Sequence, residues 1–180
     1  MAIRKILTEP NKILREKSLR VENVDKDIQR LMDDMLETMY AAPGIGLAAI
    51  QVGVAKRVIV MDISRNRDED KEPKKNPMYF INPEIIWKSK DKFTYEEGCL
   101  SVPNQFAEIE RPKQCRVRHL DYNGNPQELK AEGLLATCIQ HEIDHLEGIL
   151  FIDYLSKLKK EMIIKKLSKQ TKDNVERIVV

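Results

Sequence analysis

Two histidines, His141 and His145, lie four residues apart in a segment of helical periodicity, and this spacing limits the structures that the chain can form. In residues 134–146 apolar side chains recur at helical spacing along one side, and Gly148 follows as a C-terminal stop. On a helix, His141 and His145 lie on one face one turn apart. Two imidazoles so placed can bind one metal ion, and Glu142 between them can reach a water on that metal. The alternative is that both imidazoles lie on the helix surface, or that His145 is a hydrogen-bonded core residue.

A hydrolytic centre of this kind usually takes three protein ligands and leaves one position open for water. No histidine follows His145, and Glu147 is too near it in the sequence to point at the same ion. Upstream, Cys99 lies between Gly98 and Pro103, in what should be a turn or the irregular end of a strand. A thiol there can face the helix, which makes Cys99 the candidate third ligand.

Two other kinds of site would use the same residues. Cys138 precedes His141 by one helical turn, so Cys99, Cys138 and the two histidines could complete a closed Cys₂His₂ structural site without catalysis. A zinc peptidase would use the same helix. The sequence by itself leaves both alternatives open.

The composition is that of an ordinary globular protein. The 180 residues are 42% apolar and 33% charged with a formal net charge of +2, which excludes a mainly disordered chain and argues against a binder of DNA or another polyanion. No apolar run approaches the roughly 18 residues of a membrane span, and residues 1–12 lack the apolar stretch of a secretory signal. The three cysteines are poor material for a disulfide framework. We therefore expect a cytoplasmic protein with reduced thiols and no membrane partner.

Hydrophobic periodicity predicts an α+β fold. Helices are expected at residues 25–40, 134–146 and 154–169, and strands at 57–63, 78–86, 114–121 and 128–131. Residues 64–77 hold nine charged side chains in fourteen and are expected to form an exposed loop, whereas residues 44–51 are too short and glycine-rich to assign. We expect mixed and antiparallel strands packed around a central metal-binding helix, with a further helix at the C-terminus.

Three segments taken together resemble a known family. The sequences GIGLAAIQ at 44–51, EGCLS at 97–101 and QHEIDH at 140–145 match, in order, the three signature motifs of the bacterial peptide deformylases. The resemblance spans about residues 4–167. It implies a metal-dependent amide hydrolase of protein biosynthesis, which removes the N-formyl group from the initiator methionine of newly made polypeptides and releases formate.

The resemblance also implies roles for particular residues. Cys99, His141 and His145 would hold the metal, Glu142 would be the general base and acid, and Gln51 with the backbone N–H of Leu100 would bind the carbonyl oxygen. The metal would lower the pKa of its water, so that hydroxide attacks the formyl carbonyl at neutral pH. The resemblance implies Fe²⁺ as the ion, with Zn²⁺, Ni²⁺ or Co²⁺ able to replace it. Without the motif, Gln51 would be interpreted as an ordinary surface residue.

The same resemblance outlines a substrate pocket. Gly44 and Gly46 would let the backbone approach the peptide closely, because glycine has no Cβ. An apolar pocket for the methionine side chain would be walled by Ile45, Leu100, Leu134 and Cys138, although apolar residues beside a motif are often plain core. Glu97 and Arg111 would brace the cysteine-bearing segment, with an ordinary salt bridge as the equal alternative.

The chain divides by charge rather than by a linker. Residues 1–156 are expected to form the catalytic deformylase domain, and residues 157–180 a basic C-terminal helix and tail of that domain, with eight basic residues against three acidic ones. A solvated amphipathic helix is the simpler interpretation. Because the implied substrates are formylmethionyl chains emerging from the ribosome, contact of this helix with ribosomal RNA is a second hypothesis.

Overall fold

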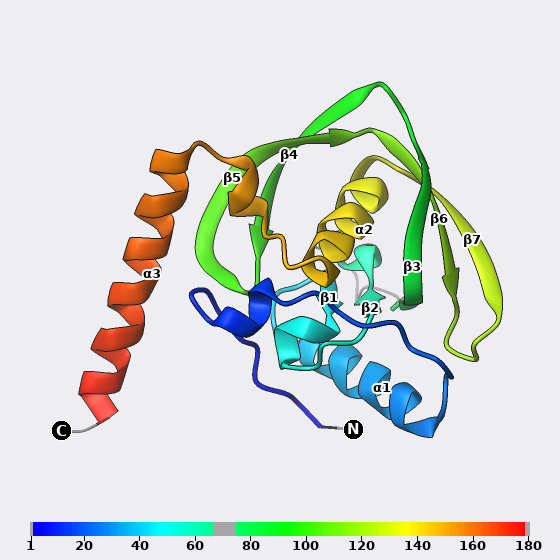
Figure 1. Ribbon diagram of the computed structural model, residues 1–180, viewed down its shortest axis with the longest axis horizontal. Coiled ribbons are helices and arrows are strands. Elements are labelled where there is room, and N and C mark those ends of the chain that lie inside the picture. The colour runs from blue at the N-terminus through cyan, green and yellow to red at the C-terminus, as the bar shows by residue number, and fades with distance from the viewer. Residues whose placement is uncertain (1, 67–74, 179–180) are drawn as a thin grey trace.

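The computed structural model describes residues 2–66 and 75–178, which form helices and antiparallel sheets (Figure 1). The helices are α1 (Lys26–Ala41), α2 (Gly133–Leu146) and α3 (Lys157–Ile178). The strands are β1 (Gly46–Ala48), β2 (Val58–Met61), β3 (Met78–Lys88), β4 (Lys92–Cys99), β5 (Val102–Pro112), β6 (Gln114–Leu120) and β7 (Pro126–Glu132). Among the described residues, no helix combines the length and the hydropathy needed to cross a membrane.

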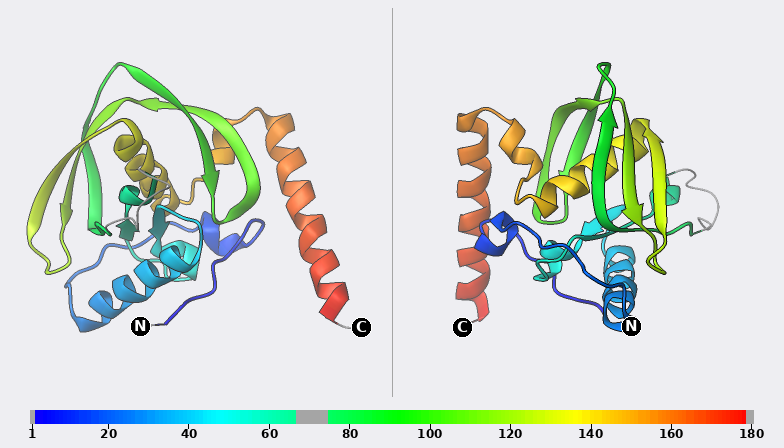
Figure 2. Two further views of the ribbon diagram at one scale, coloured as in Figure 1. Left: turned by 180° about the vertical axis from the view of Figure 1, so that it is seen from behind. Right: turned by 45° about the vertical axis from the view of Figure 1, so that its right-hand side comes forward.

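Two sheets enclose α2. Strands β1, β2, β3, β6 and β7 form a five-stranded sheet in that order, and β4 pairs with β5 in a second sheet of two strands. All ladders between these strands are antiparallel, and the one parallel contact described is an isolated bridge between Leu19 and Lys56. The expectation of mixed strands is therefore wrong. The two views of Figure 2 show α2 between the two sheets.

The short strand β2 is buried on both faces, which explains why its sequence is apolar throughout. Successive strand side chains point to opposite faces. Val58 and Val60 pack in the cluster with α1, whereas Ile59 and Met61 pack in the cluster with α2. One strand thus fixes the amphipathic helix α1 on one side of the sheet and the metal-binding candidate α2 on the other.

A third apolar cluster joins β5 to the C-terminal part of the chain. Val102 and Ile109 of β5 pack with Phe151 and with Leu167 of α3, and Cys99 lies against this cluster. The right-hand view of Figure 2 shows α3 along one side of the domain. The apolar cluster that α3 helps to form therefore supports the segment that carries Cys99.

Most of the expected elements are present, with shifted boundaries. Helix α1 begins after its N-cap Asp25, whose carboxylate accepts hydrogen bonds from the N–H groups of Asp27 and Ile28. Helix α3 begins at Lys157 rather than at residue 154, because a 3₁₀ turn, Phe151–Tyr154, precedes it. Of the expected charged loop 64–77, residues 67–74 lie outside the described residues.

Strands β4 and β5 are the main structure that the sequence pattern did not predict. Only a turn or strand end was expected near Cys99, but the two strands pair from Lys92–Pro112 to Cys99–Val102. In β4 the exposed and half-buried positions alternate, and β5 is mostly charged or polar between Asn104 and Glu110. Because these two strands contain few buried apolar residues, their sequences show almost no alternating hydrophobic pattern from which strands could be predicted.

Candidate metal centre and active site

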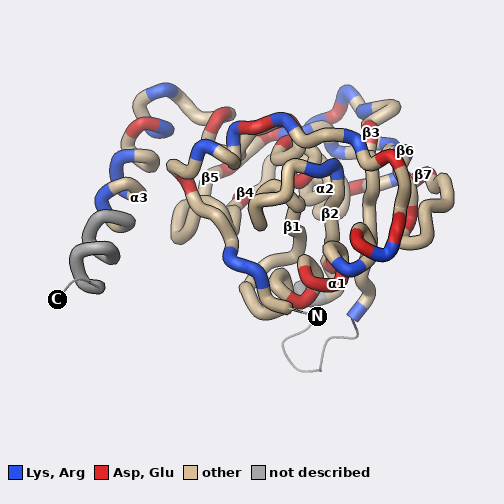
Figure 3. Tube along the Cα trace, turned by 60° about the horizontal axis from the view of Figure 1, so that its bottom comes forward, with Lys and Arg blue, Asp and Glu red and all other residues tan. Residues whose placement is uncertain are grey.

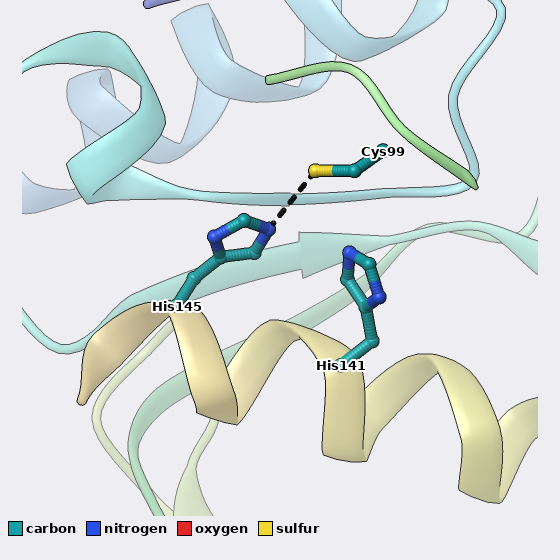
Figure 4. Close-up of side chains that lie close together, drawn as sticks. All are labelled: Cys99, His141 and His145. Atoms are coloured by element: carbon teal, nitrogen blue, oxygen red, sulfur yellow. Dashed lines mark hydrogen bonds between the residues drawn. The ribbon is translucent and has the colours of Figure 1, made fainter. Parts of the chain in front are cut away.

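The end of β4 and one face of α2 bring three metal-binding side chains together. Ligand atoms of Cys99, His141 and His145 all lie within 4.8 Å of one another. The Sγ atom of Cys99 is 3.3 Å from Nε2 of His145 (Figure 4). The two histidines come from successive turns of α2, and Cys99 faces them from the opposite side (Figure 4). This is the only such group among the described residues.

The donor set fits a divalent transition metal. A thiolate and an imidazole bound to one tetrahedral ion, at about 2.3 and 2.1 Å, place their donor atoms ~3.6 Å apart, close to the separation of Cys99 and His145. Burial lowers the pKa of His145 well below its usual value, which favours the neutral imidazole that binds metals. For His141, burial also lowers the pKa, but hydrogen bonds to Cys99 and Glu97 outweigh it and raise the pKa. A metal that displaces the proton of His141 would find both histidines as neutral imidazoles, the form that binds metals.

A buried carboxylate orients His141. The Nδ1 atom of His141 is 2.8 Å from Oε2 of Glu97, which leaves Nε2 for a metal. Arg111 donates to both oxygens of Glu97, at 2.5 and 3.0 Å, and the two side chains are 4% and 3% exposed. Burial raises the pKa of Glu97, but the hydrogen bonds from His141 and Arg111 prevail and lower it. The pair therefore does more than an ordinary salt bridge, because it holds a ligand candidate.

Asp144 and Tyr154 extend this network, although neither was predicted to have a role in the site. Arg111 donates to Oδ2 of Asp144 at 2.7 Å, and the Tyr154 hydroxyl donates to the same oxygen at 2.8 Å. The guanidinium also lies 4.8 Å from the centre of the Tyr154 ring. Asp144 lies inside the helical motif, but only the folded chain shows that it faces Arg111 rather than solvent.

Gln51 is buried at the other side of Cys99, so it is not a surface residue. Its Oε1 accepts a hydrogen bond from the N–H of Ala48 at 2.8 Å. Its Nε2 donates to Oγ of Ser101 at 3.0 Å and lies 3.6 Å from Sγ of Cys99. The amide is therefore fixed with its N–H₂ toward the sulfur. Ser101 lies in the EGCLS segment, but no role in the site was predicted for it.

Glu142 lies on α2 against β1, where the chain has room for it only because residue 46 is glycine. A Cβ at Gly46 would overlap Oε1 of Glu142 and come within 3.0 Å of its Cγ. Burial raises the pKa of Glu142 to about 7, an effect that the His141 charge opposes and the Glu97 charge increases. Oε2 of Glu142 is buried and has no hydrogen-bond partner among the described residues. This carboxylate is poised to gain or lose a proton near neutral pH.

A cavity of about 480 Å³ opens beside these groups. Its walls include all the residues expected around a substrate: Gly44, Ile45, Gly46, Gln51, Leu100, Leu134 and Cys138. They also include Cys99, His141 and Glu142, as well as Thr137 and Phe106, which were not expected. The sulfur of Cys138 lies 4.0 Å from the Ile45 carbonyl oxygen, and Cys138 does not belong to the metal-binding group. The arrangement favours an open three-ligand site over a closed Cys₂His₂ site.

The chain is similar to known proteins over nearly its whole length. The family model described as polypeptide deformylase matches residues 3–161. A peptide deformylase of Pelagibacter ubique is 70% identical over 169 residues, which cover 94% of this chain and 95% of the relative. A peptide deformylase of Phenylobacterium zucineum is 60% identical over 172 residues, 96% of this chain and 99% of the relative.

Solved structures show the same similarity. The crystal structure of the peptide deformylase from Ehrlichia chaffeensis in complex with actinonin has a TM-score of 0.88 and 49% sequence identity, over 94% of this chain and 98% of that one. The peptide deformylase from Legionella pneumophila has a TM-score of 0.86 and 43% identity, over 97% and 98% of the two chains.

Proposed function

The chain belongs to the polypeptide deformylase family, and on that premise we propose that it hydrolyses the N-formyl group from the initiator methionine of newly made polypeptides, releasing formate. The observation that carries the proposal is the convergence of Cys99, His141 and His145 on one point, next to a cavity that Cys99, His141 and Glu142 line. Because the proposed substrates are new polypeptides, the proposed place of action is the cytoplasm.

Cys99, His141 and His145 would hold the metal in this proposal. We propose Fe²⁺, on the strength of the family resemblance, with Zn²⁺, Ni²⁺ or Co²⁺ able to replace it. When bound, the metal supplies a Lewis acid that polarises the carbonyl and lowers the pKa of water. Glu97 and Arg111 would keep His141 oriented, and such supporting partners are worth about 10–100-fold in metal affinity.

Glu142 is the proposed general base and acid. It takes a proton from the attacking water and delivers a proton to the amine as the C–N bond breaks. Its pKa of about 7 and its unpartnered Oε2 support this role, because an efficient acid–base group titrates near the working pH. Glycine at position 46 supports it too, since the space beside β1 is taken by this carboxylate.

Gln51 and the backbone N–H of Leu100 are the proposed donors to the carbonyl oxygen. As the formyl carbon becomes tetrahedral, its oxygen gains negative charge, and one fixed donor contributes about 2.7–4 kcal/mol to the stabilisation of that charge. The hydrogen bonds of Gln51 to Ala48 and Ser101 support the role because they fix the amide before substrate arrives.

The methionine side chain would occupy the apolar part of the cavity. Ile45, Leu100, Leu134 and Cys138 line it, and Gly44 and Gly46 form the backbone beside it. At Gly44 a Cβ would come within 2.7 Å of Leu100, so a side chain there would push against the same wall. A flexible, unbranched thioether can fill an irregular apolar pocket.

We propose that residues 1–156 are the catalytic unit and that residues 157–180 are its basic C-terminal helix and tail. Figure 3 shows the basic residues along the described part of α3. On this helix Leu158 and Met162 are exposed among lysines. This surface supports contact with ribosomal RNA through salt-sensitive phosphate interactions. Deletion of residues 157–180 should weaken ribosome binding at low salt, and unchanged binding would refute the contact.

Product analysis tests the proposed reaction. The metal-loaded protein is incubated with a formyl-Met peptide, and formate and free methionine are both measured. Deformylation predicts formate with no methionine, whereas a zinc peptidase would release methionine. Glu142→Ala should keep its metal and lose at least 10²-fold in kcat. Near-normal turnover in that variant would remove the general-base assignment.

A further inference from the structure

We propose that Arg15 is a positioning residue for the reaction. It holds an N-terminal segment that is hydrogen-bonded to two parts of the chain, one carrying Gln51 and the other carrying the N–H of Leu100. These two groups are the proposed donors to the carbonyl oxygen. The proposal rests on the function proposed above. We call residues 7–9 the strap. In Figure 1 this segment (blue) passes close to the 3₁₀ turn that follows β1 (cyan).

The strap is hydrogen-bonded to both donor elements. The N–H of Leu7 donates to the carbonyl of Gln51 at 2.7 Å, and the N–H of Glu9 donates to the carbonyl of Ser101 at 2.8 Å. Gln51 lies in the 3₁₀ turn Ala49–Val52, while Ser101 follows directly after Leu100 in the turn between β4 and β5. Leu7 and Glu9, two residues apart, therefore tie the backbone of Gln51 to that of Ser101, which is the residue after Leu100.

Arg15 holds the strap in place. Its Nη2 is 3.2 Å from Oε1 of Glu9, and its Nη1 is 2.6 Å from Oδ2 of Asp153. Its backbone is pressed against Gly148, where φ is +74° and any side chain would overlap the Arg15 carbonyl. Asp153 is also paired with Lys160 of α3 at 2.5 Å. The guanidinium thus links the strap to the base of the C-terminal helix.

Loss of Arg15 should release the strap rather than leave it in place. Glu9 is buried, and among the described residues its only ion pair is with Arg15. Its other oxygen, Oε2, has no hydrogen-bond partner there. A buried carboxylate without a cation is strongly unfavourable, so Glu9 is expected to turn toward water and to pull its N–H away from Ser101. A displacement of about 1 Å at a reacting centre can cost up to ~10²-fold in rate.

Arg4 provides a matched control in the same N-terminal region. It pairs with Asp34 at 2.9 Å, and its side chain is 34% exposed against 30% for Arg15. The two carboxylates are buried to a similar degree: the side chain of Asp34 is 8% exposed and that of Glu9 is 7% exposed. Asp34 lies on α1, however, and the strap's bonds to Gln51 and Ser101 do not depend on it.

The test compares Arg15→Ala with Arg4→Ala in the metal-loaded protein. With a formyl-Met peptide, Arg15→Ala should lower kcat about tenfold or more and change KM less than about twofold, because the lost alignment affects the transition state. Arg4→Ala should change neither by more than about twofold. Arg15→Lys keeps one charge without the two-armed geometry, so it should restore part of the kcat. Equal kcat values in Arg15→Ala and Arg4→Ala would overturn the proposal.

Amide hydrogen exchange gives a second readout that does not depend on activity. The two variants are compared at temperatures equally far below their Tm. Exchange should be faster in Arg15→Ala than in Arg4→Ala at the amides of Leu7 and Glu9 and of residues 49–52 and 99–102. Unchanged exchange in these segments would refute the strap. If the parent protein released no formate, the proposed function would fail, while the exchange result would still decide whether Arg15 fixes these elements.

Discussion

Arg111→Ala should be the most damaging single change outside the residues that bind metal or substrate. Arg111 makes three hydrogen bonds to carboxylates, at 2.5 and 3.0 Å to the buried Glu97 and at 2.7 Å to the half-buried Asp144. Removal of one partner of a buried ion pair leaves an uncompensated charge and costs about 3–5 kcal/mol in free energy of unfolding. Arg116→Ala is the control, because Arg116 pairs with Glu128 at 3.6 Å and both side chains are 48% exposed. A surface pair of this kind contributes about 0–1 kcal/mol.

Urea unfolding of both metal-free variants measures this difference directly. Arg111→Ala should lose several times as much free energy of unfolding as Arg116→Ala. In the folded protein, Arg111→Ala should also bind metal about 10–100-fold more weakly, because Glu97 no longer holds His141 in place. If the two variants have equal stability and equal metal affinity, the buried network does not support the metal centre and the reasoning fails.

Three further changes test other parts of the site. Cys138→Ala should keep one metal ion per chain by elemental analysis, and a sharp loss of metal would revive the closed Cys₂His₂ site. Gly46→Ala should keep its metal but lower kcat at least about tenfold, because the new Cβ displaces the Glu142 carboxylate; an unchanged kcat would remove that constraint. The pKa of Glu142 is raised from 4.5 to about 7, so ionisation of Glu142 destabilises the folded metal-free protein as pH rises through this window. Glu142→Gln should therefore gain stability over the parent by about 3 kcal/mol between pH 4.5 and 7, and a pH-independent difference in urea unfolding would contradict the raised pKa.

The sequence predicted best where periodicity and chemistry coincided. Helix α2 was predictable because its apolar spacing and its two histidines indicate the same element, and β2 because it is buried on both faces. The pairing of β4 with β5 was not, since exposed and charged residues hide its period. The motifs predicted which residues line the cavity. The sequence could not show that these residues surround a single cavity, because they come from segments that are far apart in the chain.

Residues that support the site were the hardest to predict. Glu97 and Arg111 were singled out by family resemblance, yet an isolated salt bridge was an equal expectation until the structure showed His141 on the same carboxylate. Ser101 and Tyr154 carry no metal-binding or acid–base signature, so only their positions reveal their contacts with Gln51 and Arg111. Arg15 is one basic residue among many, and its role depends on two carboxylates, one of them 138 positions away.

Titration of the metal-free chain with Co²⁺, followed by absorption spectroscopy, tests whether Cys99, His141 and His145 form one metal site. One equivalent should bind and produce a thiolate-to-metal charge-transfer band together with the visible absorption of a four-coordinate ion. The band should persist in Cys138→Ala and disappear in Cys99→Ala. A parent protein that binds Co²⁺ without thiolate absorption, or that keeps the band after Cys99 is removed, would contradict a centre built from Cys99, His141 and His145.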